Sequence, residues 1–92
     1  MLNNCVLMGR IEDLEIKENN GVKMGIMYLS IPKEKEENVV LEIVVCENMI
    51  NNVKDYCDKG DLVGIKGKID LLDNKTTIIA EKITFLSTRK ND

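Results

Sequence analysis

Hydrophobic and polar residues alternate along most of this chain, and the alternation predicts β-strands. Cys5–Ile11 is a short apolar run that we expect to form the first strand. A second stretch, Leu14–Ile31, contains Asn20-Gly21, which is the strongest short signal of a hairpin turn. Pro32 ends that stretch. The pattern therefore predicts two antiparallel strands joined by a tight turn.

The next strand is expected at Val39–Cys46, after a charged turn at Lys33–Glu37. Both of its faces are largely apolar, which is typical of a strand covered on both sides. In a chain this small, we expect the second cover to come from another copy of the protein. On the preceding strand, Met27 and Leu29 share one face, so Tyr28 points away from the predicted core.

Asn48–Lys59 changes to helical spacing, with apolar residues at steps of three and four. The predicted apolar face consists of Met49, Ile50, Val53, Tyr56 and Cys57. Asn48 is a good N-cap, and Gly60 is expected to end the helix. We expect Tyr56, together with Phe85 from the last strand, to lie in the core.

Two more strands follow, Asp61 to about Leu71 and Thr76–Leu86, with a turn at Asp73-Asn74 and a polar tail over residues 87–92. Glycines inside such a strand, here Gly64 and Gly67, usually mark a bend. Three strands, a helix and two strands is the order of the OB fold, a five-stranded Greek-key barrel, although SH3-like and other small barrels compete. We predict an all-β protein with one helix, folded as one domain over about residues 3–86.

Composition narrows the class of function. The 92 residues are 43% hydrophobic and 32% charged, which is ordinary for a soluble globular domain. No apolar run is long enough to span a membrane, and the three cysteines form no close pair, so we expect a cytoplasmic protein with reduced thiols. The chain has no histidine, and its paired carboxylates fall at turns. We therefore predict no enzyme, no metal site and no cofactor.

The net charge of −3 argues against strong nucleic-acid binding, because phosphate contacts need clustered lysine and arginine. A local basic stripe on an acidic protein is still compatible with binding.

Three segments carry a resemblance to a known family. Asn3–Ile11 resembles the opening strand of bacterial and phage single-stranded-DNA-binding proteins, and Val53–Ile69 resembles the end of their helix and their fourth strand. Glu81–Leu86 is similar to their closing strand. The most specific part is the Tyr-x-x-Lys-Gly-Asp turn followed by the Gly-x-x-Gly-x-Ile strand. The resemblance implies an OB fold, a homodimer or homotetramer, and sequence-independent cover of single strands in replication, recombination and repair.

The chain departs from the family pattern where bases are held. The resemblance implies large aromatic residues at positions that fall here on Leu41 and Glu47, and in the loop around Asp73-Asn74, which has none. Basic positions after strand four fall near Asp70 and Leu72. Because stacking is worth roughly 1–3 kcal/mol per base, three lost stacks predict binding weaker by orders of magnitude. The resemblance also implies a long tail with an acidic-hydrophobic tip that recruits partner proteins, and we expect this chain to lack that tail.

Two side chains are candidates for direct contact with a nucleic acid. Tyr28 is either a relocated stacking platform or a residue of a subunit interface with Met24 and Ile26. Arg10 ends the first strand at a position that resembles a family contact, and it either binds phosphate or is a solvated surface arginine.

Five lysines complete the predicted site. Lys66 and Lys68 project from one face of strand four at a spacing of roughly 7 Å, which suits neighbouring phosphates but also any solvated strand. Lys59 either contacts phosphate or complements the end of the helix. Lys23 and Lys75 flank the two hairpin turns.

These observations support two hypotheses. The first is a minimal single-stranded-DNA-binding OB protein that acts weakly and as a homo-oligomer, with RNA as an alternative ligand; its small size favours a phage, plasmid or other mobile element. The second is an OB-fold adaptor that contacts mainly proteins of a replication or primosome-type complex. The acidic charge, the absent aromatic platforms and the apolar outer faces of strands two and three favour the adaptor.

Overall fold

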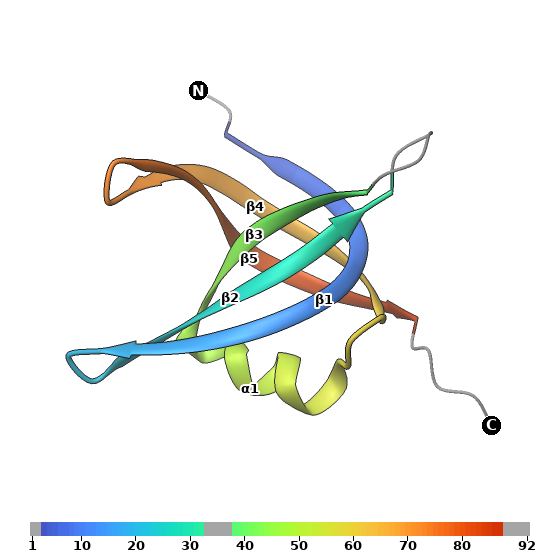
Figure 1. The fold of residues 1–92 in the computed structure, drawn as a ribbon, viewed down its shortest axis with the longest axis horizontal. Coiled ribbons are helices and arrows are strands. Elements are labelled where there is room, and N and C mark those ends of the chain that lie inside the picture. The colour runs from blue at the N-terminus through green and yellow to red at the C-terminus, as the bar shows by residue number, and fades with distance from the viewer. Residues whose placement is uncertain (1–2, 33–37, 88–92) are drawn as a thin grey trace.

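Five strands close into a barrel with one helix against it (Figure 1). The structure is a computed structural model that describes residues 3–32 and 38–87, with the backbone alone at Ser87. The elements along the chain are β1 (Cys5–Asn19), β2 (Val22–Ile31), β3 (Val39–Cys46), α1 (Glu47–Tyr56), β4 (Leu62–Leu72) and β5 (Lys75–Ser87). Around the barrel the order is β1-β2-β3-β5-β4, closing back onto β1. The predicted OB fold is confirmed.

Strand β1 is longer than predicted, because it does not end at Ile11. Its first half, Cys5–Arg10, pairs with β4, and its second half, from Arg10 to Asn19, pairs with β2. The register shifts between Ile11 and Asp13, and such a bulge bends a strand and increases its twist. One strand can therefore serve two neighbours and close the barrel.

Both hairpin turns form where the sequence predicts them. Asn20 and Gly21 have φ angles of 54° and 80°, and Asp73 and Asn74 have 51° and 63°. Two consecutive positive φ values are the mark of the type I′ turn, whose twist matches that of the strands it joins. The hairpins β1–β2 and β4–β5 both project toward the left in Figure 1.

The core lies inside the barrel and follows the alternation of each strand. Its fully buried members include Met27, Leu29, Ile43, Val45, Val63 and Ile65. Ala80 completes the core from β5, and Gly67 beside it is buried as well. A side chain at Gly67 would overlap the carbonyl oxygen of Ile79, so β4 and β5 approach closely there, next to a second register shift.

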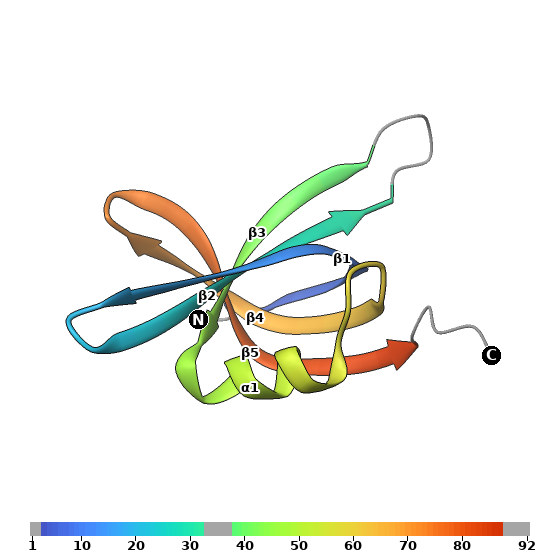
Figure 2. The same cartoon turned by 60° about the horizontal axis from the view of Figure 1, so that its bottom comes forward.

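Helix α1 covers one end of the barrel (Figure 2) and contributes Ile50 and Val53 to the core. The prediction of its ends was wrong. The N-cap is Cys46, because β3 runs directly into the helix, and Asn48 lies inside the first turn. The helix ends at Tyr56, and Gly60 instead occupies a loop with φ of 93°, where its N–H donates to the Ile11 carbonyl.

Tyr56 and Phe85 are not core residues, contrary to the prediction. Their side chains are 64% and 41% exposed, and their ring centroids lie 6.0 Å apart. Because α1 ends at Tyr56, this ring falls at the rim of the barrel and packs against Phe85 outside it.

The expected second cover of β3 is partly supplied by the chain itself. Val44 faces outward but is only 8% exposed, and it pairs with Ile26 and Ile79 on the two neighbouring strands. Val39 and Val40, at the start of β3, remain exposed. The predicted turn at Lys33–Glu37 lies outside the described residues, as do residues 88–92 of the predicted tail.

Candidate nucleic-acid interface

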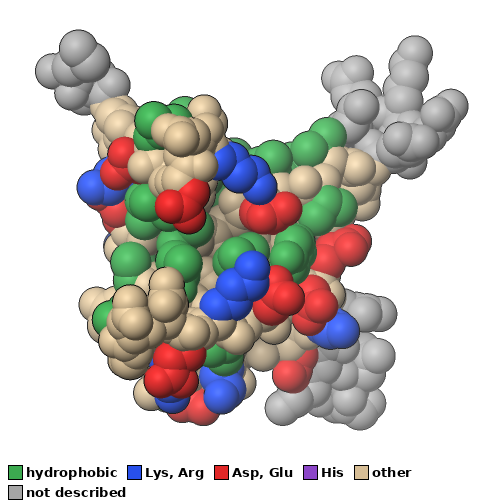
Figure 3. All heavy atoms as spheres, turned by 60° about the vertical axis from the view of Figure 1, so that its left-hand side comes forward, with side chains coloured by type: hydrophobic (Ala, Val, Ile, Leu, Met, Phe, Trp, Pro, Cys, Tyr) green, Lys and Arg blue, Asp and Glu red, His purple; other side chains and the backbone are tan. Residues whose placement is uncertain are grey.

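A groove of about 320 Å³ lies between the two hairpins, on the outer face of β2 and β3. Figure 3 shows this face, where hydrophobic side chains gather between the two projecting hairpins and charged side chains surround them. Its lining residues are Lys17, Met24, Ile26, Glu42, Val44, Leu72, Asp73, Lys75, Thr76 and Thr77. The face of strands two and three, together with the flanking loops, is where OB folds bind oligonucleotides.

The floor of the groove is aliphatic. Met24 and Ile26 come from β2 and alternate with the buried residues of that strand, and Val44 pairs with Ile26 across β3. Leu41 of β3, one of the two positions where the family pattern implies an aromatic residue, packs against the core instead, and the other, Glu47, is the first residue of α1. Met24, Ile26 and Val44 therefore offer aliphatic rather than aromatic contact to a base.

Two lysines stand on opposite walls of this groove. Lys75 follows the β4–β5 turn, as predicted, and Lys17 comes from the β1–β2 hairpin. Lys17 is not among the residues predicted from the sequence, although a signal was available. The Asn20-Gly21 turn fixes the register of its hairpin, and counting back from Asn19 opposite Val22 places Lys17 opposite Met24.

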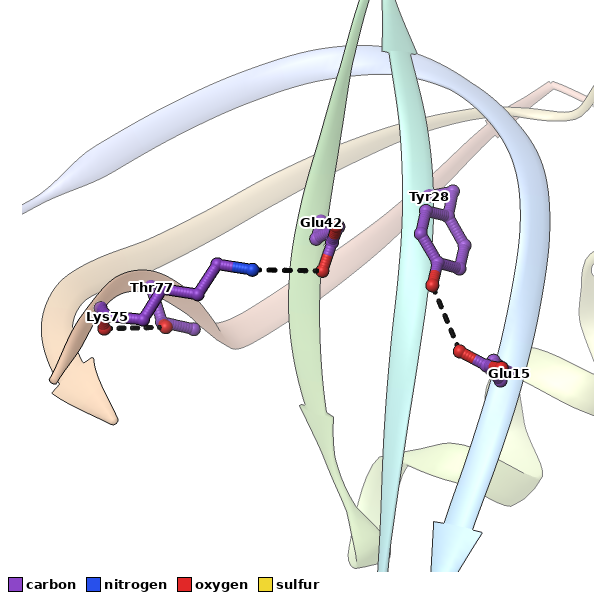
Figure 4. Close-up of polar contacts among 5 residues, drawn as sticks. All are labelled: Glu15, Tyr28, Glu42, Lys75 and Thr77. Carbon is purple, nitrogen blue, oxygen red and sulfur yellow. Dashed lines mark hydrogen bonds and ion pairs between the residues drawn. The ribbon is translucent and has the colours of Figure 1, made fainter. Parts of the chain in front are cut away.

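Tyr28 continues the groove floor beyond Ile26. Its hydroxyl donates a hydrogen bond of 2.9 Å to Oε1 of Glu15, and Figure 4 shows the ring between the β2 and β1 ribbons, directed toward Glu15. This hydrogen bond raises the pKa of the Tyr28 hydroxyl, with smaller contributions from the negative charges of Glu42 and Asp13. Tyr28 is half-buried, so part of its surface stays open at the acidic end of the face.

The groove is not a basic channel. Lys75 Nζ lies 3.8 Å from Oε1 of Glu42, an ion pair between β5 and β3 that is visible in Figure 4. Lys17 and Lys75 are balanced by Glu42 and Asp73 among the lining residues. A strand entering the groove therefore meets as many negative as positive side chains.

The other predicted contacts lie outside this groove. Arg10 donates from Nη1 to the carbonyl oxygen of Gly60 at 3.0 Å, which ties β1 to the loop after α1. Lys59 Nζ lies 3.7 Å from Oδ1 of Asp13. Lys23 faces away from the groove and lines a smaller hollow with Glu47 and Lys54 of α1.

Lys66 and Lys68 share the outer face of β4, as predicted, and Gly67 between them is buried. Lys66 is exposed and Lys68 is half-buried. They lie beside the groove rather than in it, because Lys68 pairs with Ile79 of β5, which in turn pairs with Val44 of the groove floor.

Neither a cluster suited to a metal ion nor a membrane-spanning helix is found in residues 3–32 and 38–87. No cluster of three or more His, Cys, Asp or Glu side chains is placed to hold a metal ion there. No helix in the same residues is long and apolar enough to cross a membrane.

Comparison with known proteins decides the family. No protein-family model matches the chain. The single-stranded DNA-binding protein 2 of Staphylococcus aureus strain COL is 32% identical, over 100% of this chain and 78% of its own length. The chain belongs to the family of single-stranded DNA-binding proteins. The single-stranded DNA-binding protein of Halalkalibacterium halodurans is also 32% identical, over 97% of this chain and 63% of its own length. The family resemblance predicted from the sequence is thereby confirmed.

Solved structures show the same fold as this single-stranded DNA-binding protein. The mitochondrial protein Rim1 of S. cerevisiae superposes with a TM-score of 0.81 at 19% identity, covering 96% of this chain and 97% of its own. The N-terminal domain of PriB from Thermoanaerobacter tencongensis, described as dimeric, gives 0.75 at 23% identity, with 91% and 96% covered. At these identities the likeness establishes the OB fold alone.

Proposed function

We propose that this protein binds single-stranded DNA weakly, without sequence preference and as a cytoplasmic homo-oligomer, during replication, recombination or repair. The observation that carries the proposal is the groove between the β1–β2 and β4–β5 hairpins, in a chain whose relatives are named for this activity. Residues 3–86 supply the binding domain.

The groove favours a single strand over a duplex because its contacts suit unpaired bases. Exposed bases would lie on Met24, Ile26 and the ring of Tyr28, while Lys17 and Lys75 on the two walls would meet phosphates. Aliphatic contact and one ring replace the several aromatic stacks that single-strand binders use. The side chains of Met24, Ile26 and Val44 have no donor groups that could read the edges of bases, which supports binding without sequence preference.

An exposed apolar patch supports self-association. Met8 and Leu86, 58% and 46% exposed, lie beside Gly64 on the outer face of β1, β4 and β5, and Val6, 81% exposed, lies two residues along β1 opposite Lys66. This patch lies away from the groove, so a second copy could cover it and leave the groove open. A patch of this kind on a small domain is typical of an interaction site.

The adaptor hypothesis is not favoured. The relatives that align with the whole chain are named single-stranded DNA-binding proteins, and the groove provides a place for a nucleic acid. RNA stays an alternative ligand, because the aliphatic side chains of the floor do not distinguish ribose from deoxyribose.

Fluorescence anisotropy with labelled oligo-dT of about 35 bases tests the proposal, since this length covers at least two sites of about 4–16 nucleotides each. We expect saturable binding at low salt that weakens as salt rises from about 50 to about 200 mM. The double variant Lys17→Gln with Lys75→Gln should bind less and show a shallower salt dependence.

The absence of binding at low salt with tens of micromolar protein would overturn the proposal. Native mass measurement, alone and with oligo-dT, reports the oligomer at the same time. Met8→Glu is the matched variant for the apolar patch: it should give a smaller assembly while each chain keeps its groove.

A further inference from the structure

The outer face of the β4–β5 pair carries three lysines that pairing brings together. Lys66 lies directly opposite Lys82, and Lys68, two residues along β4, lies on the same face. Directly opposed side chains on an antiparallel pair have Cβ atoms about 5 Å apart, and like charges there are destabilising. We call Lys66, Lys68 and Lys82 the β4–β5 lysine strip.

No ion pair relieves this repulsion within the part of the chain that the structure describes. The two ion pairs found there involve Lys59 and Lys75, not a lysine of the strip. Asp70, the acidic residue on the same face of β4, accepts a hydrogen bond from the backbone N–H of Leu71 at 2.7 Å. Glu81, which the bulge leaves without a partner on β4, is exposed beside Lys82, but it forms no ion pair with a lysine of the strip in the described residues, so the three lysines outnumber the two carboxylates near them, Asp70 and Glu81. The strip is therefore a concentration of positive charge on a chain whose net charge is −3.

The strip is continuous with the groove. Val44 of the groove floor pairs with Ile79 on β5, and Ile79 pairs with Lys68 on β4. Adjacent strands are about 4.8 Å apart, so roughly 10 Å separates the floor of the groove from the first lysine of the strip. A flexible strand that leaves the groove over Ile79 reaches the strip within a few nucleotides.

We propose that the β4–β5 lysine strip is a second phosphate-binding segment for the same DNA strand. The inference rests on the proposed function and extends it, because the strand would be held by bases in the groove and by backbone phosphates on the strip. Two of the lysines, Lys66 and Lys68, are predicted from the sequence, and the register with β5 adds Lys82.

Oligonucleotides of two lengths distinguish binding in the groove from binding on the β4–β5 lysine strip. Oligo-dT of about 5 nucleotides fills the groove, and one of about 16 nucleotides also reaches the strip. In Lys66→Gln with Lys82→Gln, binding of the long oligonucleotide should weaken by about threefold to thirtyfold. Its salt slope should fall by about 1.4, the value for two phosphate contacts on a single strand. Binding of the short one should not change.

Lys23→Gln with Lys54→Gln is the matched control, because it removes two charges from the α1 side of the molecule. Native mass and unfolding temperature of the strip variant should equal those of the wild type, which separates lost binding from altered folding or assembly. If the strip variant binds the long oligonucleotide with the affinity and salt slope of the wild type, the proposal that the strip binds phosphate is overturned. If neither length binds to any variant, the proposed function itself fails, and the strip fails with it.

Discussion

The Tyr28 hydroxyl is hydrogen-bonded to the Glu15 carboxylate at 2.9 Å, although the two residues are not paired across β1 and β2. Tyr28 pairs with Asp13, and Glu15 pairs with Ile26, so the bond runs diagonally across the strands. It fixes the ring over the outer face, next to the groove floor (Figure 4). A side chain that is already fixed loses less entropy when a base stacks on it.

This contact should appear in the titration of Tyr28. The Glu15 carboxylate accepts a hydrogen bond from the Tyr28 hydroxyl, which favours the neutral phenol and raises the pKa of Tyr28 above 10.0. In a Tyr56→Phe background Tyr28 is the only tyrosine, and Glu15→Gln should lower its pKa toward 10. The stability that this bond contributes is present below pH 10 and is lost as pH rises through the raised pKa. Tyrosinate absorbance measures the shift.

Glu18→Gln is the matched control for this titration, since Glu18 is exposed on β1 and pairs with Lys23 rather than with a groove residue. It should leave the midpoint of Tyr28 unchanged. An equal midpoint in Glu15→Gln and in its parent would show that the bond does not form in solution.

Glu42 is expected to weaken DNA binding from inside the groove. Its carboxylate holds Lys75 at 3.8 Å and repels an incoming phosphate. Glu42→Gln should therefore tighten oligo-dT binding by about twofold to fivefold and steepen its salt dependence, because exposed ion pairs are worth up to about 1 kcal/mol. Adding Lys75→Gln should remove much of the gain. A gain of the same size in Glu12→Gln would point to net charge and not to this pair.

A ring added to the floor should restore part of the missing stacking. Met24 is half-buried, lines the groove and pairs with Cys46. We expect Met24→Trp to tighten binding by roughly 1–3 kcal/mol, the value of one stacked base. Because the chain has no other tryptophan, quenching of its fluorescence reports the contact directly. Asn52→Trp, exposed on α1, is the control and should neither bind more tightly nor be quenched.

Two glycines of β4 should respond differently to alanine. A Cβ at Gly67 would overlap the Ile79 carbonyl oxygen, which is backbone and cannot move alone. Gly67→Ala should therefore destabilise the protein by about 1–3 kcal/mol. At Gly64 the nearest atom to an added Cβ is Leu86 Cδ1 at 3.6 Å, an ordinary contact, so Gly64→Ala should cost less than about 1 kcal/mol. Urea unfolding measures both, and equal costs would contradict the close approach of β4 and β5.

Local patterns were sufficient to predict most of the elements. Asn20-Gly21 has the positive φ angles that its turn requires, and the alternation around Met27 and Leu29 gives the buried face of β2. The helix ends were mispredicted because its first residue follows β3 without a loop, so the N-cap is Cys46 and not a residue chosen for its side chain. Tyr56 was wrongly predicted to lie in the core for a related reason. Helical spacing assigns Tyr56 to the apolar face of α1, but the helix ends at this residue, so its side chain lies at the rim of the barrel.

The sequence by itself determined the order of strands and helix along the chain, the two turns and the shortage of aromatic rings, because these depend on residue types and on neighbours within a few residues. It also determined the family, through similarity over the whole chain. Tertiary structure decided which charges share a surface. Lys17 and Lys75 flank one groove, Glu42 pairs with Lys75, and Lys66 faces Lys82, although each pair is far apart along the chain. Barrel closure and strand register bring them together, and long-range pairing of that kind leaves no mark in the local pattern of residues.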